Sequence, residues 1–124
     1  MSDPLSPVDI ENRLRALVTE MTGAQRSLAV ARDSETAAEI TFKRAKARAF
    51  HHSDCPHVTR GGHTVADRDA WVDTKVMDEW AQARVATTAR EIAVDNLRVV
   101  LAIAETVRSL GASVRQAYSL SGAA

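Results

Sequence analysis

The sequence has few of the residues that build thick cores or disulfide frameworks. Its 124 residues include a single cysteine, and aromatic residues make up only 4%. One cysteine forms no internal disulfide, which favours a reducing compartment such as the cytoplasm. Basic and acidic residues number 16 each, so the net charge is zero. This balance argues against a protein whose main task is to coat nucleic acid.

Long apolar runs are also missing. No stretch reaches the roughly 18 uncharged apolar residues that a membrane-spanning helix needs. The opening residues MSDPLSPVDIENRLR lack a basic start followed by an apolar run, so we expect no signal peptide. We therefore expect a cytoplasmic protein without a membrane partner.

A heptad pattern fills the first half of the chain. Ser6 and Asp9 favour a helix start at Pro7, and no proline interrupts the chain from there to about residue 50. Apolar and small residues recur every seven positions in two series, which predicts one long helix with a packing seam. The two series are Leu14, Met21, Leu28, Glu35, Phe42 and Ala49, and Leu17, Ala24, Ala31, Ala38 and Ala45.

A second long helix is predicted after a loop at residues 51–63. Thr64 can cap it, with Asp67 at its third position, and Gly111 is expected to end it after about residue 110. A tail of residues 111–124 follows. Two helices of equal length joined by a short loop predict an all-α, coiled-coil-like antiparallel hairpin that forms one domain over residues 1–124.

The second helix carries more apolar surface than one partner helix covers. One stripe is Ala86, Ala93, Leu97, Val100, Ala104 and Val107. Beside it lie Val85, Ile92, Val99, Ile103 and Leu110, with Val94 and Leu101 widening the surface. We expect self-association into a four-helix bundle, as a homodimer, or docking onto another protein. A monomer whose tail folds back over the stripe is the alternative.

Further candidate contacts flank this surface. Trp71 and Trp80 would lie on opposite faces of one helix, and Trp80 shares a face with Met77 and Arg84, as a binding patch or as part of a dimer seam. The tail is either a docking peptide or a frayed end. The predicted partner-binding residues are Trp80, Arg84, Ile92, Val99, Ile103, Leu110, Arg115 and Tyr118.

Basic residues cluster at the end of the first helix. A direct nucleic-acid-binding site would use Lys43, Arg44, Lys46, Arg48 and Arg60. The alternative is that these residues face the acidic start of the second helix, at Asp67, Asp69 and Asp73. We favour this second interpretation because it also suits both helix dipoles.

All four histidines and the cysteine lie in the predicted loop, HHSDCPHVTRGGH. The Cys55-x-His57 spacing is tighter than in usual zinc fingers, so we expect an exposed polar turn and no metal. A zinc-stapled hairpin with His51, Cys55, His57 and His63 as ligands stays open as an alternative. No nucleophile motif or glycine-rich phosphate loop is present, so we expect neither catalysis nor a cofactor.

Two motifs in the second half carry a resemblance. They are T-V-A-x-R-D-A-W at residues 64–71 and S-L-G-x-S-V-R-x-x-Y at residues 109–118. With these motifs the chain resembles small helical proteins of actinobacterial phages and prophages. The resemblance implies an accessory protein of phage DNA metabolism, acting with a recombination or replication protein or on a host factor in the bacterial cytoplasm. It assigns no functional residues.

Overall fold

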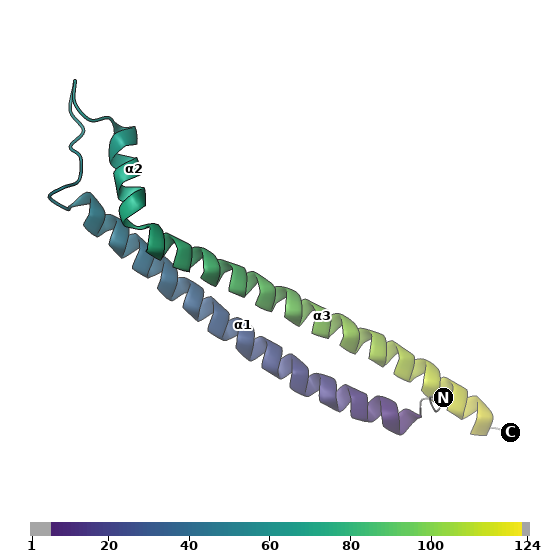
Figure 1. Ribbon diagram of the computed structural model, residues 1–124. Coiled ribbons are helices and arrows are strands. Elements are labelled where there is room, and N and C mark those ends of the chain that lie inside the picture. The colour runs from purple at the N-terminus through teal and green to yellow at the C-terminus, as the bar shows by residue number, and fades with distance from the viewer. Residues whose placement is uncertain (1–5, 123–124) are drawn as a thin grey trace. The chain divides into compact units, whose positions relative to one another are not determined.

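Three helices make up almost all of the computed structural model, which describes residues 6–122. Helix α1 spans Pro7–Phe50, α2 spans Val65–Lys75 and α3 spans Met77–Gly122. Figure 1 shows α1 and α3 as the two long elements. The described residues contain no strand, only an isolated bridge between Val58 and His63. The predicted all-α class is confirmed.

The chain divides into two compact units. The terminal unit comprises residues 1–29 and 92–124, and the loop unit comprises residues 30–91. In the terminal unit, Ile10 near the start of α1 packs against Gly111 near the end of α3. In the loop unit, Glu35 of α1 pairs with Arg90 of α3, and Ala45 packs with Val76. In each unit α1 therefore packs against α3. That the whole chain forms one domain stays a prediction.

The predicted heptad seam of α1 is the face that α1 buries. Every residue of the two predicted series is buried or half-buried, and Leu17 is completely covered. The first predicted stripe of α3, from Ala86 to Val107, is also buried or half-buried at each of its residues. Small side chains on both helices, such as Ala24 and Ala104, allow the two backbones to approach closely.

The predicted helix starts are confirmed by their capping contacts. Asp9 N–H donates to Ser6 Oγ at 3.2 Å, and Ser6 N–H donates back to Asp9 Oδ2 at 3.1 Å. Thr64 and Asp67 form the same reciprocal pair at the start of α2. The Ser6 hydroxyl and backbone N–H donate to the Asp9 carboxylate and lower its pKa, and the Thr64 backbone N–H, which donates to the Asp67 carboxylate, is the main cause of the lowered pKa of Asp67. Each capping box satisfies backbone N–H groups that have no partner within the helix.

The prediction of one unbroken helix from residue 64 to residue 110 is wrong. The chain turns at Val76, between α2 and α3, where it leaves the helical conformation with ψ near 16°. The run Val72-Asp73-Thr74-Lys75-Val76 contains β-branched residues and an aspartate, which are weak helix formers. Val72 and Val76 are 0% and 3% exposed, because both pack against the end of α1. Tertiary burial at a site of low helix propensity therefore produces the break.

Gly111 does not end α3, contrary to the prediction. The helix continues through it to Gly122, so the expected tail is helical as far as that residue. A Cβ atom at Gly111 would lie 2.7 Å from Cγ2 of Ile10, so a side chain has no room there. The glycine serves close packing of α3 on α1, and it keeps a helical conformation.

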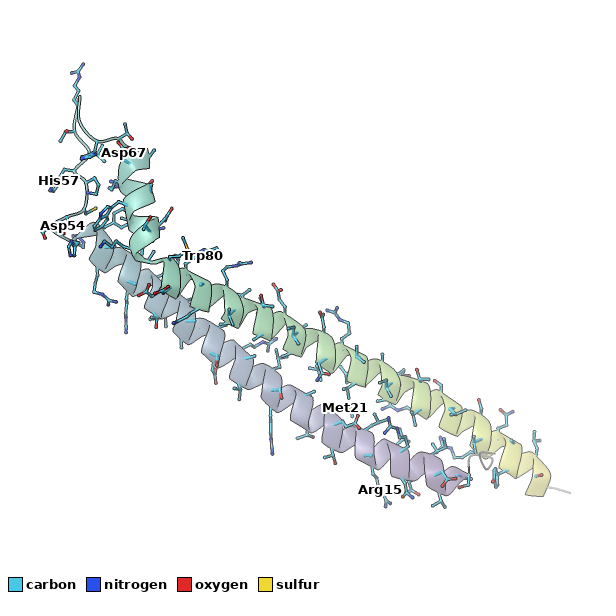
Figure 2. All side chains as sticks on the ribbon, in the orientation of Figure 1. Arg15, Met21, Asp54, His57, Asp67 and Trp80 are labelled. Carbon is cyan, nitrogen blue, oxygen red and sulfur yellow. The ribbon has the colours of Figure 1, made fainter. Side chains whose placement is uncertain are left out.

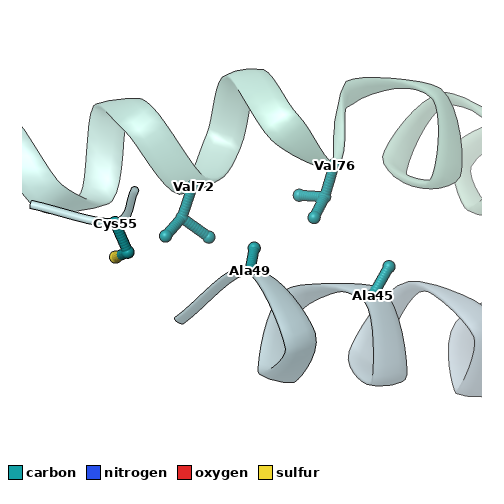
Figure 3. Packing of buried hydrophobic residues seen from close by; sticks show 5 residues of the cluster. All are labelled: Ala45, Ala49, Cys55, Val72 and Val76. Atoms are coloured by element: carbon teal, nitrogen blue, oxygen red, sulfur yellow. The ribbon is translucent and has the colours of Figure 1, made fainter. Parts of the chain in front are cut away.

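A small apolar cluster closes the loop unit. Figure 3 shows Cys55 and Val72 facing the end of α1, with Val76 one turn further along. Phe42 and Trp71 pack around this cluster. The loop that follows α1 is thereby held against α2 by its buried cysteine side chain.

Candidate functional site

The second apolar stripe of α3 is not covered by α1. In the terminal unit, Ile92 is 62% exposed and Val99 is 55% exposed, while Ile103 and Leu110 are 38% and 41% exposed. Val85, which belongs to the loop unit, is exposed as well. Apolar surface that recurs on one side of a helix is a feature of helices that receive a further partner.

This stripe is part of a second heptad seam, which we call the outer seam. Its positions alternate spacings of four and three residues, as those of the buried seam do. The outer seam of the terminal unit is Ile92, Asn96, Val99, Ile103, Thr106, Leu110, Ser113, Ala117 and Leu120. All nine side chains are exposed, and none of them is charged. The acidic and basic residues of this part of α3 lie at other positions.

The opposite edge of the helix pair in the terminal unit has a different character. A hollow of about 300 Å³ is lined there by Glu11, Arg108 and Arg115, over Leu14 and Gly111. Arg115 therefore lies apart from the outer seam, although both contribute to the predicted partner-binding set. Tyr118, the last member of that set, is 51% exposed on the final turns of α3. The terminal unit thus presents one uncharged edge and one charged edge.

The other two predicted partner-binding residues, Trp80 and Arg84, belong to the loop unit. Trp80 is exposed and lines a hollow of about 310 Å³ with Phe42 and Met77, just past the turn at Val76. Figure 2 labels Trp80 at the start of α3. Arg84 lines an adjoining hollow beside Trp80. Met77, Trp80 and Arg84, which the sequence analysis placed on one face, are all exposed, so the Trp80 ring is accessible to solvent.

Trp71 and Trp80 differ in burial as predicted, but the reason given from the sequence does not apply. Trp71 lies on α2 and is half-buried, with its ring 5.7 Å from the ring of His52 and beneath the Lys75 ammonium at 5.3 Å. Trp80 lies on α3. The turn at Val76 separates the two tryptophans, so they belong to different helices and do not lie on opposite faces of one helix.

The sequence predicts that the basic end of α1 faces Asp67, Asp69 and Asp73, and the structure shows no ion pair between the two groups. Within the described chain, no carboxylate lies within 4 Å of Lys43, Arg44, Lys46, Arg48 or Arg60; the ion pairs that are formed involve other residues. Asp69 is 3.4 Å from Arg68, and Asp67 is 3.9 Å from His63. The partners of Asp67 and Asp69 are therefore neighbours in the sequence and not residues of α1.

The loop histidines do not gather into a metal site. Among residues 6–122, no group of three or more histidine, cysteine or acidic side chains could hold a metal ion. Cys55 is buried in the apolar cluster, whereas its three predicted co-ligands His51, His57 and His63 are exposed. Figure 2 shows His57 and Asp54 on the loop. His52 accepts a hydrogen bond at Nδ1 from the backbone N–H of Asp54.

Sequence reasoning missed two features. The outer seam continues through Asn96 and Thr106, which a search for apolar residues alone passes over, although their heptad spacing was available to find them. Glu35 was recognised as a seam position, but its partner Arg90 was not, because the register of the two helices could not be fixed without the structure.

Comparison with protein-family models, with curated proteins and with solved structures finds no match to this chain. Within the described residues, no helix combines the length and apolarity needed to cross a membrane. The resemblance to actinobacterial phage proteins stays a prediction.

Proposed function

We propose that this chain is a non-enzymatic helical adaptor that works by binding proteins through α3. Through this helix it pairs with a second copy of itself and binds a protein partner. The single observation that supports this proposal is the outer seam, a set of exposed, uncharged side chains at heptad spacing in the terminal unit. No cofactor or metal takes part.

Leaving the apolar side chains of the outer seam in contact with water is unfavourable in free energy, which favours their burial against another helix. Removing apolar surface from water contributes roughly 25 cal/mol per Å², and a regular seam offers that surface to another helix with matching knobs and holes. The buried seam of the same helix already binds α1 by this geometry. Because α3 has seams on two faces, it can pack against α1 with one seam and against a helix of another chain with the other.

The resemblance to phage proteins suggests the kind of partner. A protein of DNA recombination or replication, or a host factor of the same processes, fits a small adaptor in the bacterial cytoplasm. The exposed Trp80 beside Arg84 in the loop unit supports a second contact area, since tryptophan and arginine are frequent at the centres of protein interfaces.

The test is affinity capture of one named candidate at a time with the full chain. Val99→Glu places a charge on the outer seam, and we expect it to abolish both self-association and capture of any partner that uses this face. Leu101→Glu is the matched control: Leu101 is 48% exposed on the same helix but about 200° further around it. Equal loss in both variants, or no loss in either, would contradict the proposal. Circular dichroism verifies that both variants stay helical.

Direct nucleic-acid binding is a second candidate, and one observation favours it. Lys43, Arg44, Lys46 and Arg48 lie within one stretch of α1, and none has a carboxylate partner within 4 Å among the described residues. Electrostatic binding should weaken steeply with salt. Charge reversal at Arg44 and Arg48 should remove it and leave self-association unchanged. Binding that is insensitive to both changes rules this candidate out.

A further inference from the structure

The outer seam has a symmetry of its own about the position of Leu101. From Ile92 to Leu110, the apolar residues Ile92, Val99, Ile103 and Leu110 surround two polar ones, Asn96 and Thr106. Ile92 is as far before Leu101 as Leu110 is after it. The same holds for Asn96 and Thr106, and for Val99 and Ile103. Reversing the direction of the seam between Ile92 and Leu110 therefore reproduces its order of apolar and polar residues.

We propose that the part of the outer seam from Ile92 to Leu110 binds the same part of a second copy of this chain, with the two α3 helices antiparallel and centred near Leu101. Ile92 then meets Leu110 of the second copy, Asn96 meets Thr106, and Val99 meets Ile103. This inference rests on the self-association in the proposed function and specifies its direction and register. The contact is isologous, as two-fold dimers require.

The polar residues select this register. Sliding the antiparallel pair by one heptad places Asn96 against Val99 in one direction and Thr106 against Ile103 in the other. Each of these arrangements buries a polar side chain against an aliphatic one, which is unfavourable because its hydrogen-bonding groups lose water without gaining a partner. A polar residue within an apolar seam is a known means of fixing register. Among these three registers, only the proposed one pairs Asn96 with Thr106 and places neither of them against an aliphatic side chain.

The chemistry of the polar pair is complementary. Thr106 Oγ1 already donates its proton to the backbone oxygen of Ala102 at 3.0 Å. Its lone pairs remain available, so Thr106 can accept a hydrogen bond. The Asn96 side-chain amide supplies N–H donors. The two-fold symmetry forms this Asn–Thr contact twice, once on each side of the axis.

The residues beside the seam also permit the approach. Ala102 lies next to the axis and is small, so the two helices can come close together. Asp95 lies beside the seam at a position that meets Ser109 of the second copy, so no like charges oppose one another there. In a parallel, in-register dimer each seam residue would meet its own copy whatever the sequence. The symmetric order of polar and apolar residues therefore supports the antiparallel pair and gives no support to the parallel one.

The experiment combines the oligomeric state with cysteine cross-linking of the full chain in a Cys55→Ala background. Ile92→Cys and Leu110→Cys chains are oxidised separately and as a mixture. In the proposed dimer, the two copies of residue 92 lie about 27 Å apart along the helix, so neither chain alone forms a disulfide dimer. The mixture forms the mixed disulfide. We expect the Val99→Glu variant to weaken dimerisation by more than roughly tenfold in sedimentation equilibrium.

Each other result overturns the inference in a distinct way. Disulfide dimers of each chain alone indicate a parallel pair, and cross-linking of Ile92→Cys to Ile103→Cys indicates a slipped register. Both outcomes leave the self-association of the proposed function intact. A chain that stays monomeric at every concentration rejects the inference together with self-association, and the capture experiment then decides separately whether the adaptor function survives.

Discussion

Nε of Arg90 donates hydrogen bonds to both carboxylate oxygens of Glu35, at 3.1 and 3.0 Å, between α3 and α1 of the loop unit. Both residues occupy positions in the buried seam, where the other members are apolar or small. Glu35 leaves 18% of its side chain exposed, and Arg90 leaves 31%. The pair thus places one charged contact in an otherwise apolar interface and fixes which residues of the two helices lie opposite each other.

The first prediction concerns the pH dependence of this pair. Hydrogen bonding to Arg90 lowers the pKa of Glu35 below its ordinary value, and a contact with Thr87 adds to this effect. Because the folded-state pKa is lowered, the contribution to stability is present above the unfolded pKa and is lost as pH falls through the folded pKa. Melting temperatures measured from neutral to acidic pH should therefore fall more for the native chain than for Glu35→Gln.

Glu39→Gln is the control for this measurement. Glu39 lies about one turn further along α1 and has no ion-pair partner within 4 Å among residues 6–122. We expect its variant to keep the acid sensitivity of the native chain. Identical pH profiles for Glu35→Gln and the native chain would contradict the assigned role of the pair.

The second prediction compares two helical glycines. Gly111→Ala should lower the free energy of unfolding by about 1 kcal/mol, because the added methyl meets Ile10 Cγ2 and the β-branched side chain of Ile10 has little freedom to move in a helix. This cost exceeds the gain in helix propensity. Urea denaturation measures the difference.

Gly23→Ala is the matched substitution, and it should have the opposite sign. Nothing lies within 4 Å of a Cβ atom at Gly23, so only the helix propensity changes. We expect a gain of about 0.5–1 kcal/mol. Stabilisation by both substitutions would show that α3 does not need the close approach at Gly111.

The third prediction uses Cys55 as a reporter on the loop unit. Its side chain is 6% exposed within the apolar cluster, so a thiol reagent should label it slowly in the folded chain and rapidly in denaturant. Val72→Ala removes methyl groups from the centre of this cluster and should accelerate labelling, since it favours local opening. Val85→Ala, at an exposed position of the same unit, should leave the rate unchanged. Fast labelling of the native chain would disprove the burial of Cys55.

The fourth prediction concerns the cap of α2. Thr64 Oγ1 accepts a hydrogen bond from the Asp67 N–H, and Thr64→Ala should cost about 1 kcal/mol of stability. Thr22→Ala in α1 is the control, because Thr22 Oγ1 only donates to a backbone oxygen within its own exposed helix turn. We expect that change to be neutral or slightly stabilising in thermal denaturation. A loss at Thr22 equal to that at Thr64 would argue against a capping role.

The parts of the candidate site differ in how far the sequence predicts them. The exposed residues Ile92, Val99, Ile103 and Leu110 could be identified because helical periodicity assigns each residue to a face and two stripes exceed what one partner covers. The basic end of α1 was expected to face Asp67, Asp69 and Asp73, but no ion pair joins the two groups. Placing separate elements opposite each other needs their register, which periodicity does not contain. The loop histidines and Cys55 could be listed, but only the packing of Cys55 beneath α2 decided that they lie apart.

The sequence by itself determined the all-α class, the starts of α1 and α2, and the buried seam, since capping pairs and heptads act over one or two helical turns. Tertiary structure alone decided the turn at Val76, the passage of α3 through Gly111 and the pairing of Glu35 with Arg90. These three features depend on contacts between residues far apart in the chain. At Val76, burial against α1 outweighs the continuity of the helix. At Gly111, contact with Ile10 gives a glycine a packing role where local propensity predicts an end.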